Sequence, residues 1–308
     1  MTHQHFDELP IAEPPQRVSG MRVPESWALP GKPSDLAPDA EDAWRQTGFI
    51  LGADLRLLEA NLDLQVRVAA SGYQISARTM RMAAIASLWS RALVTAGDAA
   101  HLARAGSYQS ALGLVRQAVE LLAAERGLAS DPQAWEDFKG WAHRGYSTHA
   151  GSRADEVGLG HYFAGEEIAS DAALRVIYRG ASDLARPNFG PTALFVANEA
   201  THQRYPLVFG DRAFHLGWAE LISGWLLHLG AAQLHLALHA ANHFPAPSEL
   251  REEVVTHVRA IEAHLASLAA GETPRCRLEE YIDEDGRRRH LLIDFRRRPG
   301  DAAKRVLL

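Results

Sequence analysis

The longest apolar stretch of the chain is residues 211–244, DRAFHLGWAELISGWLLHLGAAQLHLALHAANHF. Between Glu220 and Glu249 it contains no Asp, Glu, Lys or Arg. A helix that is apolar almost all round belongs in the core of a large protein, so the stretch predicts a buried central helix. Residues 221–241 are also long enough to cross a bilayer. Three histidines and Gln233 within them favour the core helix, and we expect no membrane partner.

Four histidines, at spacings of seven, four and four residues, share one face of this helix: His228, His235, His239 and His243. At about 100° per residue they fall within a sector of roughly 80°. Gly217, Gly224 and Ala231 repeat every seven residues close to this sector and would let another helix approach closely. The face would then lie against the last helix or across a dimer axis, where imidazole protonation makes assembly sensitive to pH near about 6 to 7.

The same histidines suggest a metal or haem site, because imidazoles one helical turn apart can share an ion. The candidate ligands on this helix are His235, His239 and His243. Glu199 and His202 have the Glu-x-x-His spacing of metal-binding bundles and would add ligands from another segment. A di-iron bundle needs that motif on two helices, and this chain has it once.

The sequence as a whole predicts an all-α bundle of about eight helices over residues 39–270. Residues 1–38 hold seven of the fifteen prolines and predict an extended or disordered arm. We expect one helix from Asp39 to about residue 70, a second from Tyr73 to Thr95, and a break at Gly97. A clear helical seam follows in residues 107–128, SYQSALGLVRQAVELLAAERGL, formed by Tyr108, Leu112, Val115, Val119 and Leu122.

Residues 271–308 predict a small β-hairpin with a basic tail. The segment RCRLEEYIDEDGRRRHLLIDFRRR, residues 275–298, alternates around a turn at Asp285-Gly286. A two-residue turn there places Arg277 opposite Asp294 and Asp283 opposite Arg288. Residues 275–308 contain ten Lys or Arg and seven Asp or Glu, whereas the whole chain has a net charge of -6. A basic hairpin on an acidic body suits RNA or an acidic protein surface, including a neighbouring subunit.

The chain contains one cysteine, Cys276, so it cannot form an internal disulfide. A reducing cytoplasm is the simplest location for such a protein. The amino terminus has neither the basic region nor the apolar region of a secretory signal. Cytoplasmic localisation is therefore the expectation.

Residues 144–149, RGYSTH, place Arg144 and His149 four residues apart. This element resembles the RxxxxH motif of HEPN ribonucleases, which are dimeric helical proteins that cleave RNA without metal. The resemblance implies that Arg144 holds the scissile phosphate and that His149 transfers a proton. The family places the motif on a helix, whereas here Gly145 leads into a glycine-rich segment.

A broader resemblance covers about residues 100–190. The seam segment, residues 107–128, together with YRGASDLARPNFGP, residues 178–191, is similar to bacterial helical proteins of the DUF5677 group. Arg186 stands before Pro187 where that group has a histidine, which removes support for a catalytic role of this turn. The resemblance implies a helical bundle and no particular activity.

Three functional hypotheses follow from these patterns. The first is a homo-oligomeric interaction or regulatory protein, most simply a dimer, which needs no cofactor. The second is a HEPN-like ribonuclease that uses Arg144 and His149. The third is a metal- or haem-binding bundle that uses the histidine-rich helix.

Overall fold

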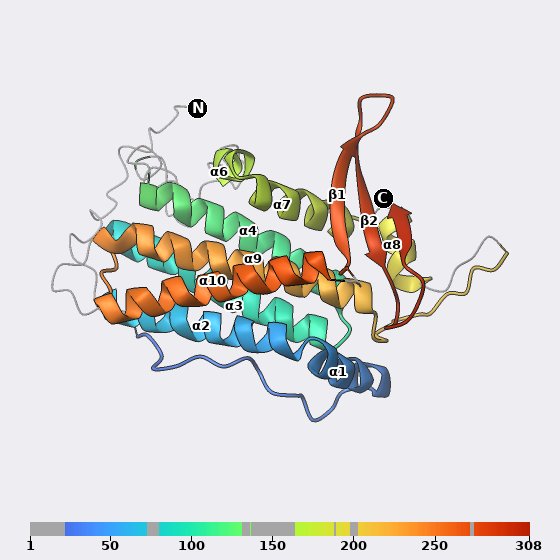
Figure 1. Ribbon diagram of the computed structural model, residues 1–308, viewed down its shortest axis with the longest axis horizontal. Helices are drawn as coiled ribbons and strands as arrows, with labels where there is room; N and C mark the ends of the chain where they lie inside the picture. The colour runs from blue at the N-terminus through green and yellow to red at the C-terminus, as the bar shows by residue number, and fades with distance from the viewer. Residues whose placement is uncertain are drawn as a thin grey trace, which may run out of the picture.

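The computed structural model describes residues 22–72, 80–130, 136, 164–187, 189–197, 203–271 and 274–308. These residues form a bundle of long helices with a small sheet at one end (Figure 1). The α-helices of the described ranges are α1 (Pro38–Ile50), α2 (Gly52–Gly72), α3 (Met80–Arg104), α4 (Tyr108–Ser130), α6 (Ala164–Ser170), α7 (Ala172–Ala185), α8 (Phe189–Val196), α9 (Leu216–His239) and α10 (Ser248–Ala270). The strands β1 (Arg277–Ile282), β2 (Arg288–Phe295) and β3 (Lys304–Leu307) form an antiparallel sheet in the order β1-β2-β3. The prediction of a helical bundle followed by a C-terminal hairpin is confirmed.

The apolar stretch forms α9, and this helix occupies the centre of the bundle. Seventeen of its 24 residues are buried, and it packs against α2, α3, α4 and α10. Together with the short 3-10 turn Ala240–Asn242, it is long and apolar enough to cross a membrane by length and composition. Of its most apolar window, however, 67% is buried inside the bundle. The other helices of the protein therefore cover most of this apolar surface.

The helical seam predicted for residues 107–128 forms the inner face of α4. All five of its residues, Tyr108, Leu112, Val115, Val119 and Leu122, are buried in the main core. Side chains spaced alternately by four and three residues remain on one side of a helix, which explains why this prediction succeeded.

Two helix boundaries differ from the sequence prediction. Residues 38–72 form two helices, α1 and α2, because the chain bends at Leu51, which is buried. The predicted break at Gly97 is wrong, since α3 continues without interruption to Arg104. Ala99 and Ala100, just after the glycine, are fully packed, and such burial outweighs a glycine cost of about 1 kcal/mol.

Residues 22–37 form no helix or strand and run along α2 towards α1 (Figure 1). The backbone N–H of Trp27 donates to Asp63 Oδ1 at 2.9 Å, which ties this segment to α2. The part of the predicted arm before Arg22 lies outside the described residues.

The hairpin forms, but its register differs by one residue from the expected one. Arg277 lies opposite Ile293, one position before the expected partner. The backbone N–H of Asp283 donates to the Arg287 oxygen at 2.8 Å, so the turn consists of residues 284–286, one more than a two-residue turn, and Gly286 in it has a φ of 74°. Because side chains alternate along a strand, a shift of one residue exchanges its two faces. Leu292, which pairs with Leu278, is therefore fully buried, whereas its neighbour Leu291 is only half-buried.

The ion pairs of the hairpin change with its register. Asp283 binds Arg289 at 2.7 Å instead of Arg288. The expected contact between Arg277 and Asp294 does form, at 2.5 Å, although the two residues are not direct cross-strand partners. A third strand, β3, pairs with β2 in the region that was expected to be a basic tail.

Candidate functional site

Four of the predicted site residues lie outside the described residues: Arg144, His149, Glu199 and His202. The RxxxxH element and the Glu-x-x-His element therefore stay predictions, and so do the ribonuclease and metal hypotheses that depend on them.

The histidine face of α9 lies on the outer side of this helix. His235 and His239 are exposed on α9, whereas His243 is half-buried and lies beyond the end of this helix, after the 3-10 turn Ala240–Asn242, so the prediction that His243 shares the helical face is wrong. His235 Nε2 lies 3.5 Å from a carboxylate oxygen of Glu262 on α10, and His239 Nδ1 lies 2.7 Å from the backbone oxygen of His235. In the parts of the chain that the structure describes, no group of three His, Cys, Asp or Glu side chains is placed to hold a metal ion. The arrangement across a dimer axis stays a prediction.

Two histidines of α10 point inward and connect this helix to α2. His257 Nε2 lies 3.2 Å from the backbone oxygen of Leu57. His264 Nε2 lies 2.8 Å from Asp54 Oδ1. Their spacing of seven residues places both on the side of α10 that faces α2.

Asp54 is the centre of a buried polar cluster. Its side chain is 1% exposed and accepts hydrogen bonds from His264, from Arg275 and, at 2.8 Å, from Ser223 Oγ. Burial opposes ionisation of Asp54, but the Arg275, His264 and Ser223 donors outweigh it and hold the pKa of this carboxyl below its ordinary value. The cluster joins α2, α9, α10 and the segment before β1, and three donors satisfy its carboxylate.

A cleft of about 380 Å³ opens next to this cluster, between α9, the end of α10 and β1. Its polar lining consists of Glu220, His228, Arg275, Arg277 and Asp294. Its apolar lining consists of Leu221, Trp225, Leu265, Leu268 and Leu278. A concave site with an apolar wall and a few converging polar groups has the composition of a small-molecule site.

Glu220 is the buried carboxyl of the cleft, with 8% of the residue exposed. Its Oε2 accepts the backbone N–H of Cys276 at 3.0 Å, and no described residue donates to its Oε1. Burial raises the pKa of Glu220 above its ordinary value, although the Cys276 N–H and the charge of Arg275 partly oppose the shift. One carboxyl oxygen therefore remains available to a hydrogen-bond donor in the cleft.

The rim of the cleft contains an unusual backbone conformation. Asp294 has a φ of 58°, and the pairing of β2 with β3 is irregular between Leu292 and Phe295. This irregularity directs Asp294 towards Arg277. Asp294 Oδ2 accepts a hydrogen bond from Arg277 Nη1 at 2.5 Å. A non-glycine residue in the left-handed region marks a position that the surrounding structure holds in place.

Cys276 also lines the cleft, but its surroundings do not activate the thiol as a nucleophile. Burial raises the pKa of this thiol, and the nearby carboxylates Glu220 and Asp294 raise it further. Because only the thiolate is a strong nucleophile, Cys276 acts as a packing residue in this environment.

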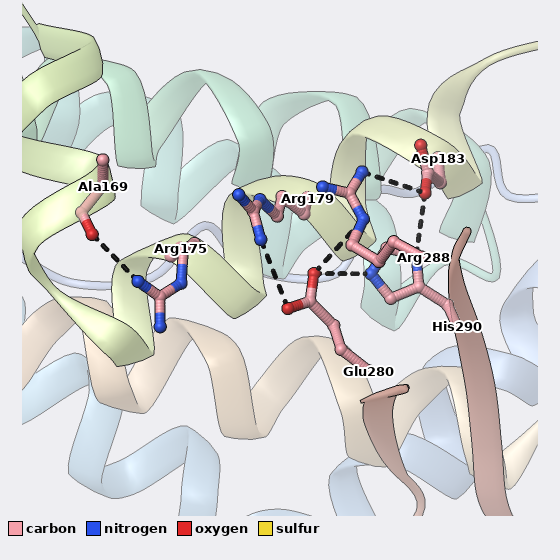
Figure 2. A network of polar contacts seen from close by, with 7 residues as sticks. All are labelled: Ala169, Arg175, Arg179, Asp183, Glu280, Arg288 and His290. Atoms are coloured by element: carbon pink, nitrogen blue, oxygen red, sulfur yellow. Dashed lines mark hydrogen bonds and ion pairs between the residues drawn. The ribbon is translucent and has the colours of Figure 1, made fainter. Parts of the chain in front are cut away.

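A second polar network docks the hairpin on α7 (Figure 2). His290 on β2 is 2% exposed, its Nδ1 lies 2.7 Å from Asp183 Oδ2, and its Nε2 lies 3.1 Å from Glu280 Oε1. Arg179 of α7 and Arg288 of β2 flank the same carboxylates. Each nitrogen of the imidazole thus lies against a carboxylate oxygen. The network therefore satisfies its own charges and positions the sheet.

Exposed apolar side chains gather at the end of the molecule that carries the sheet. Residues 203–210, here called the projecting loop, extend beyond α8 (Figure 1). This loop exposes Tyr205, Leu207, Val208 and Phe209, and Phe209 is entirely open to solvent. The hairpin adds exposed Tyr281 and Ile282, and β3 adds Leu307.

Sequence reasoning missed Glu220 as a site residue, although a signal was present. Glu220 is the only charged residue between Ala213 and Ser248, if histidine is counted as neutral. A single carboxyl in an otherwise uncharged core helix requires either a partner or a function. Asp54 gave no comparable signal, because its partners are more than 160 positions away in the chain.

No protein-family model, no curated protein and no solved structure matches this chain. The assignment of a function therefore rests on the geometry of the described residues. Two features carry it: the apolar surface at the sheet end, and the cleft around Glu220.

Proposed function

We propose that this protein is a self-associating interaction protein and that two copies meet through the sheet end. The supporting observation is the projecting loop, where Tyr205, Leu207, Val208 and Phe209 are exposed within five consecutive positions. Such a run of exposed apolar side chains is a liability on an isolated soluble surface, and it is typical of an interface.

Charge complementarity supports a second copy as the partner. Residues 275–308, which form the sheet, carry three more basic than acidic residues, whereas the whole chain has a net charge of -6. The remainder of the chain is acidic, so a second copy supplies acidic surface for this basic sheet and an identical apolar loop to be covered. Closed symmetric dimers are the commonest assembly of this kind.

The oligomeric state tests the proposal. Light scattering coupled to size exclusion should give a dimer for the wild type and a monomer for the double variant Leu207→Asp/Phe209→Asp. Phe49→Ser is the matched control, because Phe49 is also largely exposed but lies at the end of α1. A monomeric wild type, or a double variant that remains dimeric, contradicts the proposal.

A further inference from the structure

We infer that the cleft between α9, α10 and β1 binds a small primary amine with an apolar body, and that Glu220 holds its ammonium group. All of the residues that line the cleft come from one chain, so the site does not require the self-association proposed above.

The first observation is the open oxygen of Glu220. Glu220 is more than nine-tenths buried, and no described residue donates to its Oε1. A carboxylate removed from water is stabilised by a hydrogen bond from a cation, and such charge-assisted bonds are about twice as strong as neutral ones. An ammonium group in the cleft supplies both the charge and the donor.

The arginines of the cleft do not favour an anionic ligand. Arg275 already binds Asp54, and Arg277 binds Asp294 and Glu279. Carboxylates of the protein thus compensate both guanidinium groups, whereas Glu220 has no ion-pair partner within 4.0 Å among the described residues. The uncompensated charge of the cleft is negative.

The second observation concerns the glycines of α9. A Cβ at Gly217 would lie 2.6 Å from the Phe295 ring, and a Cβ at Gly230 would lie 2.7 Å from Asn61 Oδ1, so close packing explains both glycines. At Gly224, which lines the cleft one turn after Glu220, a Cβ would meet no atom within 4 Å. Glycine in a helix interior is less stable than alanine, because its backbone loses more conformational freedom on folding. No packing contact explains this glycine, whereas a large side chain at this position would occupy part of the cleft that it lines.

The apolar lining defines the remainder of the ligand. The cleft is lined by Leu221 and Trp225 of α9, by Leu265 and Leu268 of α10, and by Leu278 of β1. An apolar group bound against these side chains removes apolar surface from water, which favours binding. A ligand with an amine at one end and an aromatic or branched aliphatic body matches both parts of the site.

Calorimetric titration with benzylamine, and with benzyl alcohol as a neutral analogue of similar shape, tests the inference. The amine should bind the wild type more tightly than the alcohol does. Glu220→Gln keeps an acceptor for the Cys276 N–H but removes the charge, so it should weaken amine binding about 10- to 100-fold. Its effect on the alcohol should be small.

Gly224→Leu should abolish binding of the amine, because the new side chain fills the cleft. Gly113→Leu is the matched control, since Gly113 is also a helical glycine whose added Cβ meets no atom within 4 Å, but it lies on α4. Circular dichroism checks that each variant is folded. If Gly224→Leu does not fold, the titration of Glu220→Gln still tests the inference.

Three results would overturn the inference: no binding of benzylamine to the wild type, equal affinity for the alcohol, or undiminished amine binding in Glu220→Gln or in folded Gly224→Leu. The same titration on Leu207→Asp/Phe209→Asp separates the two proposals. Amine binding should persist in that variant whatever its oligomeric state.

Discussion

His264 Nε2 lies 2.8 Å from Asp54 Oδ1, although 210 positions separate the two residues in the chain. The same carboxylate binds Arg275 and Ser223, so one buried anion joins the beginning and the end of the helical bundle. This arrangement leads to the first of four predictions.

Asp54→Asn should destabilise the protein by about 3 kcal/mol near neutral pH, because it leaves Arg275 without its buried counter-charge. Asp42→Asn, which removes a carboxylate of an exposed pair with Arg45, should change stability by less than about 0.5 kcal/mol. Urea denaturation of both variants measures the difference.

The pKa of Asp54 is lowered, so the contribution of Asp54 to stability is complete above about pH 3.8 and is lost as the pH falls through the folded-state value. A constant difference between Asp54→Asn and wild type down to strongly acid pH would contradict this account.

Glu125→Gln should stabilise the protein at alkaline pH. Glu125 is 1% exposed, and both of its oxygens lie within 2.8 Å of Gln233 Nε2. Burial raises the pKa of Glu125 well above 4.5, with Gln233 opposing the shift, so the contribution of Glu125 to stability is complete below pH 4.5 and is lost as the pH rises through the folded-state value. The variant removes this penalty, with a gain of about 1–3 kcal/mol at pH 8 and a smaller change at pH 5. Thermal unfolding at both pH values provides the measurement, and an equal effect at both would argue against it.

The same substitution at two glycines of α9 should have opposite effects. Gly224→Ala should raise stability by about 0.5–1 kcal/mol, because its methyl group enters open space and a helix favours alanine. Gly230→Ala should lower stability by about 1–3 kcal/mol, because the methyl group would collide with the buried Asn61 side chain. Chemical denaturation compares the two variants, and changes of the same sign would contradict the packing described for this helix.

His215→Phe should make the protein less sensitive to acid. His215 is buried and stacks on Phe295, with ring centroids 4.5 Å apart. Burial, assisted by the charge of Arg297, lowers the pKa of His215 to about 3 from an ordinary 6.5. The unfolded chain therefore takes up a proton before the folded chain does, and stability is lost as the pH falls from 6.5 towards 3. Melting temperatures of variant and wild type should diverge over that range, whereas parallel curves would show that His215 is not responsible.

The helices could be predicted from the sequence where their signals were local. The seam from Tyr108 to Leu122 and the composition of residues 211–244 each identified a buried face, since period and polarity are readable within one segment. The hairpin was recognised for the same reason. Its predicted register was wrong because the turn contains three residues, with Gly286 at a positive φ, instead of the two that an Asp-Gly turn predicts.

The candidate site could be predicted only in part. Glu220 was conspicuous as the lone charge of α9, but its position beside Arg275 depends on how β1 packs on the bundle. The partners of Asp54 come from three other segments, and no periodicity within α2 indicates them. Histidine spacing suggested a ligand row on α9, whereas the polar cluster uses His264 on α10 instead.

The bond between Asp54 and Arg275 also has a consequence for protein synthesis. Asp54 is synthesised 221 residues before Arg275, whose guanidinium group it binds. Until Arg275 has been synthesised, this guanidinium cannot balance the charge of the Asp54 carboxylate. Contacts between residues so distant in sequence form late and slow folding. Incomplete chains that end before Arg275 would bury this charge at a high cost, which leaves them open to cellular proteases until translation reaches the sheet.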